Sequence, residues 1–261
     1  MALTLLAPQS TIPVAARFRI ALAGNPNCGK TSLFNALTGT RQHVANYPGV
    51  TVERRTGTFS LGDATVEVVD LPGTYGLSAF SPEERVAEDE LATGPDVVVV
   101  VADSMQLQRN LVLLSQVLLA GANPVLCLNM ADEARAAGQK LDVPLMEKLL
   151  GLPVVETVAR TGEGLDALRE AIRRAAAAPL PRHRVVLGEE LDGALSAIAP
   201  LLPGEVAPRQ REWAALRLLL EAGEPGPRVE GPAGREKAAA EARRQRARLE
   251  AKHERAISVF V

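Results

Sequence analysis

Several features that direct a sequence toward other classes of protein are scarce in this chain of 261 residues. Aromatic residues make up only 3% of it, so the hydrophobic 47% must build an aliphatic core. Its cysteines, Cys28 and Cys127, lie far apart without metal-ligand spacing, which favours free thiols in a reducing cytosol. Its histidines, His43, His183 and His253, are isolated, so we assign no iron or zinc site.

Long apolar runs are also missing. A membrane span needs about 20 apolar residues, and the nearest candidate, residues 111–130, is interrupted by polar side chains and a proline. The N-terminus, MALTLLAPQS, lacks the positive flank of a signal peptide. The formal net charge of −2 gives no reason to expect nucleic acid as a partner. The sequence therefore predicts a soluble protein that does not bind nucleic acid.

Short β-rich runs alternate with longer helical patterns from residue 17 to about residue 178. This alternation is typical of an α/β fold, a mostly parallel sheet flanked by helices. The valine run Val97 to Val101 predicts a central strand buried on both sides, and a hairpin is expected around Gly62-Asp63. We predict strands at residues 17–23, 56–60, 65–69, 97–101, 124–128 and 153–157, and helices at residues 30–38, 107–120, 143–150 and 164–178.

The composition changes near Pro179 and Pro181, which end the last of these helices. No strand-like alternation follows, and helices are expected at residues 188–199, 211–221 and 235–258, separated by Pro- and Gly-containing stretches. We therefore divide the chain into an N-terminal extension at residues 1–16, an α/β domain at residues 17–180 and a small all-helical domain at residues 181–261.

The last expected helix is basic. Residues 235–255 hold eight Lys/Arg and four Glu, and the apolar residues Ile257 to Val261 follow them. A helix that runs toward an anionic membrane surface has this composition, and so does a helix with a solvated charged face. Both interpretations stay open on the sequence alone.

The strongest motif is GNPNCGKT, Gly24 to Thr31, which fits G-x-x-x-x-G-K-[ST] between an expected strand and an expected helix. Its glycines allow turns that direct backbone N–H groups at phosphate oxygens, and the helix adds the positive end of its dipole. Lys30 would lie against the β- and γ-phosphates, and the Thr31 hydroxyl would bind Mg²⁺. The motif predicts a nucleoside triphosphate site.

Two further features fit the phosphate side of such a site. Asp70-Leu71-Pro72-Gly73 follows an expected strand, so Asp70 could hold Mg²⁺ through water and the Gly73 N–H could approach the γ-phosphate. Alone, such a cluster is usually a turn. Thr51 lies in the polar stretch before the hairpin. In a G protein, a mobile loop at this point supplies a threonine that binds Mg²⁺ only when the γ-phosphate is present.

The base side is indicated by Asn129-Met130-Ala131-Asp132, directly after the expected strand at residues 124–128. Asp132 would accept two hydrogen bonds from N1 and N2 of guanine, whereas adenine would leave the carboxylate unpaired. Asp132 could also cap a helix, and the two roles are compatible. Asn129 would tie the base-binding loop to the P-loop. These residues predict guanine as the base.

A weaker guanine motif is the triplet Thr157-Val158-Ala159, because Ser-Ala is usual at its second and third positions and Val158 offers no hydroxyl. Backbone N–H groups of the triplet could still reach the guanine oxygen. The residues expected to bind the nucleotide are Gly24, Asn25, Pro26, Asn27, Cys28, Gly29, Lys30, Thr31, Ser32, Asn129, Met130, Asp132, Thr157, Val158 and Ala159.

Together these motifs resemble the N-terminal region of the bacterial ferrous iron transport protein B family. The likeness begins near residue 18 and rests on GNPNCGKTSLFNALTG (Gly24 to Gly39), NYPGVTVE (Asn46 to Glu53), DLPGTYGL (Asp70 to Leu77), QRNL (Gln108 to Leu111) and NMADEA (Asn129 to Ala134). It implies a P-loop G domain with a GTPase fold at residues 17–180, binding GTP or GDP with Mg²⁺. The helical remainder resembles the family's helical domain in position and type only.

The same resemblance implies a cellular role. GTP binding and slow hydrolysis would regulate Fe²⁺ transport by a membrane iron-permease domain that would normally follow in the same full-length protein. The chain would then lie at the cytoplasmic face of the bacterial inner membrane, and a homo-oligomer is possible. It would not transport iron by itself.

The catalytic expectation departs from a common pattern. Many G proteins place a glutamine after the D-x-x-G glycine to orient water, but Thr74 stands here, so backbone groups of Gly73 and Thr51 would have to do so. Resemblance to potassium-activated GTPases implies that Asn27 helps to hold K⁺ between the phosphates, although an asparagine there can simply cap the loop. We expect catalysis to involve Asn27, Lys30, Thr51 and Gly73.

Cys28 permits two interpretations. A thiol beside a helix N-terminus can have a lowered pKa and act as a redox switch. The favoured interpretation is a small side chain that a tight loop tolerates.

Two other functions compete with the favoured one. A GTPase of ribosome assembly or tRNA modification shares this type of P-loop, but it needs an RNA-binding appendage, and the C-terminal part shows none. A nucleotide-gated binding module with incidental hydrolysis would share every motif, and turnover that is near background and indifferent to K⁺ would distinguish it.

Overall fold

The computed structural model describes residues 17–39, 42–77, 81–177, 185–221 and 234–253. Several predictions fall outside these residues: the extension at residues 1–16, His183, the prolines Pro179 and Pro181, most of the Gly-containing stretches at 223–226 and 231–234, and the apolar residues Ile257 to Val261. The chain splits into two compact units. One comprises residues 1–113 and 123–181, the other residues 114–122 and 182–261.

A seven-stranded sheet forms the first unit, with the strand order β2-β3-β4-β1-β5-β6-β7. Strands β4, β1, β5, β6 and β7 run parallel, whereas β2 and β3 add two antiparallel pairings. The α/β prediction is confirmed. The strands are β1 (Arg17–Gly24), β2 (Gln42–Asn46), β3 (Glu53–Leu61), β4 (Ala64–Asp70), β5 (Val97–Asp103), β6 (Pro124–Asn129) and β7 (Val154–Glu156).

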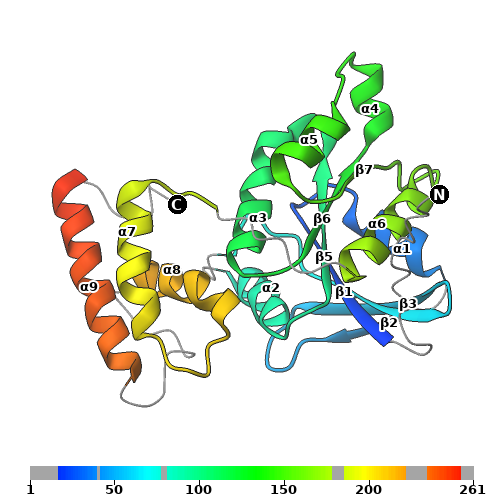
Figure 1. Ribbon diagram of the computed structural model, residues 1–261. Coiled ribbons are helices and arrows are strands. Elements are labelled where there is room, and N and C mark those ends of the chain that lie inside the picture. Colours follow the sequence, from blue (N-terminus) through cyan, green and yellow to red (C-terminus); the bar gives the residue numbers. More distant parts are fainter. Residues whose placement is uncertain (1–16, 40–41, 78–80, 178–184, 222–233, 254–261) are drawn as a thin grey trace, which may run out of the picture. The chain divides into compact units, whose positions relative to one another are not determined.

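Helices cover both faces of this sheet (Figure 1). Helices α1 and α6 share one buried hydrophobic cluster with β1, β4, β5 and β6. Helix α2 contacts β1 from the other face (Figure 1). The helices of this part of the chain are α1 (Lys30–Thr38), α2 (Pro82–Ala92), the 3-10 turn η1 (Ser104–Gln106), α3 (Leu107–Leu119), α4 (Ala131–Ala136), α5 (Val143–Leu150) and α6 (Leu165–Ala177).

Strand β2 and the α-helices α2 and α4 of this unit were not predicted. Strand β2 lies within the stretch expected to be a loop, and all five of its residues are exposed. Its polar composition gives no alternation, so only pairing with β3 reveals it as a strand. Helix α2 begins after Ser81, whose hydroxyl accepts the N–H of Glu84 at 3.1 Å. Ser-Pro-Glu-Glu at this point is a helix-start signal that the sequence offers.

The parallel strands bring the motifs to one edge of the sheet. Leu22 of β1 pairs with Asp70 of β4, and Gly24 pairs with Val101 of β5. Asp103 at the end of β5 pairs with Asn129 at the end of β6. Ligand sites of open α/β sheets lie beyond the carboxyl ends of the strands, which is where these motifs are found.

The second unit is helical in its described residues, in agreement with the prediction. Apart from its part of α3, these residues form α7 (Glu189–Ile198), α8 (Arg211–Glu221) and α9 (Gly234–His253), with the 3-10 turns η2 (Ala199–Leu201) and η3 (Pro208–Gln210). Leu195, Trp213, Leu216 and Leu219 are among their buried side chains. Within the described part of the chain, no helix is both long enough and apolar enough to span a membrane.

Candidate functional site

The loop between β1 and α1 adopts the backbone that its motif predicts. Asn27 and Gly29 both have positive φ, 67° and 81°, a conformation that glycine and asparagine tolerate best. Gly29 caps α1 without any side-chain hydrogen bond. A helix leaves its first N–H groups without intrahelical partners. The loop therefore presents backbone donors and a positive helix end, which suits an anion.

Two glycines of this loop cannot carry a side chain. A Cβ on Gly24 would lie 2.6 Å from the Cys28 Sγ and 2.7 Å from the Val101 carbonyl oxygen. A Cβ on Gly29 would lie 2.2 Å from the Asn129 Nδ2. The glycines are thus required by close packing of the loop on β5 and β6, in addition to any ligand.

Lys30 and Asp70 form an ion pair beneath the loop, with side chains only 9% and 6% exposed. Burial raises the pKa of the Asp70 carboxyl, and the Lys30 ammonium acts in the opposite direction. The protein's own carboxylate thus takes the place of an anion beside the lysine. A phosphate could take over Lys30 while a cation takes over Asp70, so the pair fits a phosphate bound together with a metal ion.

The D-x-x-G segment lies against the P-loop. The Thr74 N–H donates to the Gly24 carbonyl oxygen at 3.2 Å. A Cβ on Gly73 would be 3.4 Å from the Pro26 Cα, which is ordinary contact. Gly73 itself is exposed. Its position beside the P-loop is consistent with the predicted role near a terminal phosphate.

Thr51 lies in a turn that we name the Thr51 segment (residues 47–52). The Tyr47 N–H donates to the Val52 carbonyl oxygen at 2.9 Å, and the Val50 N–H donates to the Tyr47 carbonyl oxygen at 3.3 Å. Thr51 is exposed at the tip, whereas Tyr47 is buried. No described contact brings Thr51 onto the P-loop, so its metal-binding role stays a prediction.

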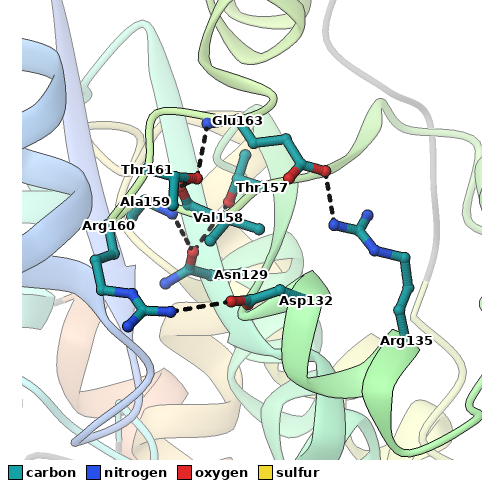
Figure 2. A network of polar contacts seen from close by, with 9 residues as sticks. All are labelled: Asn129, Asp132, Arg135, Thr157, Val158, Ala159, Arg160, Thr161 and Glu163. Atoms are coloured by element: carbon teal, nitrogen blue, oxygen red, sulfur yellow. Dashed lines mark hydrogen bonds and ion pairs between the residues drawn. The ribbon is translucent and has the colours of Figure 1, made fainter.

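Asn129 connects the two halves of the site. Its Nδ2 donates to the Cys28 carbonyl oxygen at 3.0 Å, so the predicted link to the P-loop is present. Its Oδ1 accepts from the Thr157 hydroxyl at 3.2 Å and from the Ala159 N–H at 3.0 Å, as Figure 2 shows. The Ser104 hydroxyl donates to its carbonyl oxygen at 2.7 Å. One buried amide therefore fixes the P-loop and the base-side loop relative to each other.

The predicted triplet has no spare backbone donors in this structure. The Thr157 N–H donates to the Leu128 carbonyl oxygen at 2.8 Å, and the Val158 N–H donates to that of Glu163 at 3.0 Å. The Ala159 N–H is taken by Asn129. A contact from these groups to a guanine oxygen would require one of the bonds to be exchanged. In this structure the triplet supports Asn129.

Asp132 stands at the rim of the site with its side chain 35% exposed. Its Oδ2 lies 3.3 Å from an Arg160 guanidinium nitrogen, and Arg135 pairs with Glu163 at 2.7 Å alongside it (Figure 2). Arg160 was not predicted, although it directly follows the triplet. An exposed ion pair is weak, so the carboxylate can accept other donors.

Both thiols are buried, which disfavours their ionised form. Burial raises the pKa of Cys28 to about 11, with the nearby Lys30 acting in the opposite direction. Burial likewise raises the pKa of Cys127 to about 12. This direction favours the interpretation of Cys28 as a small side chain in a tight loop over that of an activated thiol, because desolvation outweighs the helix N-terminus. Across the described residues, no three His, Cys, Asp or Glu side chains gather to hold a metal ion.

The sheet and its motifs are shared with known proteins. The family model of ferrous iron transport protein B matches residues 18–172. The Fe(2+) transporter FeoB of Escherichia coli is 39% identical over 211 residues, which cover 78% of this chain and 27% of that protein. The chain thus spans about a quarter of that relative's length.

Solved structures agree with this match. The cytosolic domain of the T. maritima FeoB iron transporter in its GMPPNP form has a TM-score of 0.72 and 36% identity, covering 90% of this chain and 98% of that one. A mutant of S. thermophilus NFeoB bound to mGDP has a TM-score of 0.80 and 32% identity, covering 94% of each chain. The P-loop GTPase fold with a helical region is confirmed.

Proposed function

The chain belongs to the ferrous iron transport protein B family, and from this premise we propose that residues 17–180 bind and slowly hydrolyse GTP. The observation that carries the proposal is the meeting of a P-loop, a buried Lys30–Asp70 pair and an Asn129 bridge at one sheet edge. The related structures described above hold GMPPNP and mGDP, which supports a guanine nucleotide here.

The proposed division of labour follows the geometry. Lys30 would leave Asp70 for the β- and γ-phosphates, and the N–H groups of α1 would bind the phosphate oxygens. Thr31 and Asp70 would hold Mg²⁺, joined by Thr51 when its segment closes, and the metal would supply positive charge against the phosphates. Gly73, which carries no side chain beside Pro26, would direct its N–H to the γ-phosphate and help to orient water.

Guanine recognition tests the nucleotide proposal most sharply. Asp132 offers only acceptors, which match the two donors of guanine, whereas an asparagine offers one acceptor and one donor edge and matches xanthine. We expect Asp132→Asn to weaken GTP binding by about 10- to 100-fold, since hydrogen bonds to charged groups contribute ~1.5–3 kcal/mol. Titration with fluorescent GTP and xanthosine triphosphate would show the exchange of preference.

The neighbouring Glu133 supplies the matched control. It is exposed on the same helix, so Glu133→Gln changes the same charge beside the site without touching the base. We expect its GTP affinity to equal that of the natural chain. Unchanged GTP affinity in Asp132→Asn would contradict guanine recognition by this carboxylate.

A further part of the proposal is stimulation by K⁺ through Asn27. The exposed position of Asn27 within the P-loop supports it. The left-handed backbone of Asn27 independently favours asparagine. The substitutions must therefore separate this backbone preference from a role of the side-chain oxygen in binding K⁺. Asn27→Gly removes the amide oxygen but keeps the backbone, and Asn27→Asp keeps an oxygen.

Hydrolysis in KCl and NaCl at equal ionic strength tests this part. We expect faster turnover in KCl for the natural chain, loss of the difference in Asn27→Gly, and retention of a cation response in Asn27→Asp. Equal rates of the natural chain in both salts would refute the K⁺ assignment while leaving GTP hydrolysis intact.

For the whole protein, we propose that this G domain and the helical domain at residues 181–261 regulate Fe²⁺ passage through a membrane iron-permease domain of the same protein. The site would then lie at the cytoplasmic face of the bacterial inner membrane, and association into a homo-oligomer belongs to the same proposal. Fe²⁺ flux through vesicles that hold the full-length protein with Asp132→Asn, loaded with either GTP or xanthosine triphosphate, would examine this coupling. A flux that is the same with both nucleotides would contradict it.

A further inference from the structure

Glu90 is a buried carboxylate that the proposed nucleotide site does not use. It lies on α2 and is 7% exposed. Its Oε1 lies 3.3 Å from a guanidinium nitrogen of Arg19, on β1, and 3.6 Å from one of Arg54, on β3. A single carboxylate oxygen therefore joins a helix to two strands, one of them the strand that leaves the Thr51 segment.

The partners of Glu90 differ in what they hold. Arg19 belongs to the central sheet and also bonds to the Thr93 hydroxyl at the end of α2, so this contact ties the helix to the sheet. Arg54 is half-buried at the second residue of β3, directly after the Thr51 segment. A buried charge is costly without partners. Glu90, which lies outside the Thr51 segment, thus holds Arg54 in place.

Arg54 passes this restraint to the Thr51 segment through Tyr47. Its guanidinium carbon lies 5.7 Å from the centre of the Tyr47 ring, within cation–π range. Tyr47 in turn bonds both ways across the turn, to Val52 through its N–H and to Val50 through its carbonyl oxygen. Burial, followed by the nearby Glu90, raises the pKa of Tyr47 to about 12, so the phenol is neutral at physiological pH.

We propose that Glu90 is a positioning residue that, through Arg54 and Tyr47, holds the Thr51 segment ready for the triphosphate. The proposal rests on the nucleotide site proposed above. Helix α2, which carries Glu90, also lies on the C-terminal side of Asp70 and Gly73 in the sequence.

This role makes a prediction that a merely structural role does not. Thr51 is expected to contribute only when the γ-phosphate is present. Loosening its segment therefore weakens binding of a GTP analogue and leaves GDP binding unchanged. A general loss of stability would weaken both nucleotides together, so the ratio of the two dissociation constants isolates the positioning effect.

The experiment measures GMPPNP and GDP binding with Mg²⁺ in the full chain and its variants. For Glu90→Gln we expect the ratio of the GMPPNP to the GDP dissociation constant to rise about 3- to 10-fold, within the range of coupling effects from residues outside a site. Arg54→Gln should raise this ratio likewise. Arg54→Lys should bring the ratio back toward that of the natural chain, because the positive charge returns.

Arg19→Gln is the matched control, because it removes the other guanidinium from the same carboxylate. We expect it to lower the melting temperature without changing the ratio, since Arg54 and Tyr47 remain in place. An unchanged ratio in both Glu90→Gln and Arg54→Gln, with GDP bound normally, would overturn the proposal. A parallel fall in both affinities would also overturn it. A natural chain that binds neither nucleotide would overturn the proposed function itself.

Discussion

The P-loop and the Thr51 segment face the same proposed phosphates but are built in opposite ways. Gly24 and Gly29 of the P-loop have no space for a Cβ, and Lys30 is buried against Asp70. In the Thr51 segment, a Cβ on Gly49 would meet nothing within 4 Å, and Thr51 is exposed. The P-loop is packed closely against the sheet, whereas the Thr51 segment is attached mainly through Tyr47.

This difference indicates which of the two segments is able to move. Local opening costs the least free energy where a segment is held by few apolar contacts and where its hydrogen bonds are exposed to solvent. The P-loop is fixed by Asn129 and by the sheet, so its donors stand ready before any ligand arrives. The Thr51 segment is joined to exposed β2 and can change position at small cost. Substitutions should therefore reduce the stability of the ligand-free chain much more in the P-loop.

The largest effect is expected for Lys30→Met, which leaves the buried Asp70 carboxylate without its cation. Removing one partner of a buried ion pair costs ~3–5 kcal/mol, or about 2–4 °C of melting temperature per kcal/mol. The pKa of Asp70 is already raised by burial, and losing Lys30 raises it further. Because the folded state then binds the proton more tightly, stability falls as pH rises from the ordinary aspartate range through the raised pKa.

Chemical denaturation of Lys30→Met and the natural chain from about pH 3, which lies below the ordinary aspartate pKa of about 3.9, up to about pH 8 would check this prediction. The difference in unfolding free energy should be small at the acid end and largest at the alkaline end. Adding Asp70→Asn to Lys30→Met should recover most of the loss, because no buried carboxylate then remains. A difference that does not change with pH would contradict the explanation.

The contrast also explains which features could be predicted from the sequence. The P-loop, Asp70 and Asn129 stand at strand ends inside local motifs, so their residue types and order were sufficient to place them. The restraint on the Thr51 segment was not predictable in this way. Glu90 is separated from Arg19 by 71 residues, and only the fold brings them together.

Local pattern also failed where tertiary contact decided the structure. Strand β2 carries no alternation and forms by pairing with β3. Burial reversed the pKa shift that the helix N-terminus suggested for Cys28. Each case depends on what surrounds the residue, which one sequence does not state.

An effect of intermediate size on stability is expected when a glycine is replaced by alanine in the P-loop and, separately, in the Thr51 segment. Gly29→Ala forces alanine into φ 81° and displaces the Asn129 amide, so we expect a loss of ~2–4 kcal/mol from strain and a broken buried hydrogen bond. Gly49→Ala introduces only the strain of alanine at φ 76°, about 1–2 kcal/mol. Urea unfolding of the two variants compares them directly. Equal losses would mean that the P-loop is not packed as described.

The smallest effect on stability is expected for Thr51→Ala. An exposed side chain without packed neighbours changes unfolding free energy by no more than about 0.5 kcal/mol, so its melting curve should coincide with that of the natural chain. Hydrolysis should nevertheless fall by about tenfold or more, because a group that meets the γ-phosphate during the reaction is lost. Ser60→Ala removes an exposed hydroxyl at the far end of β3 and should alter neither property. Unchanged turnover in Thr51→Ala would remove this segment from the proposed site, while a large fall in its stability would show that the segment is packed and not free to close.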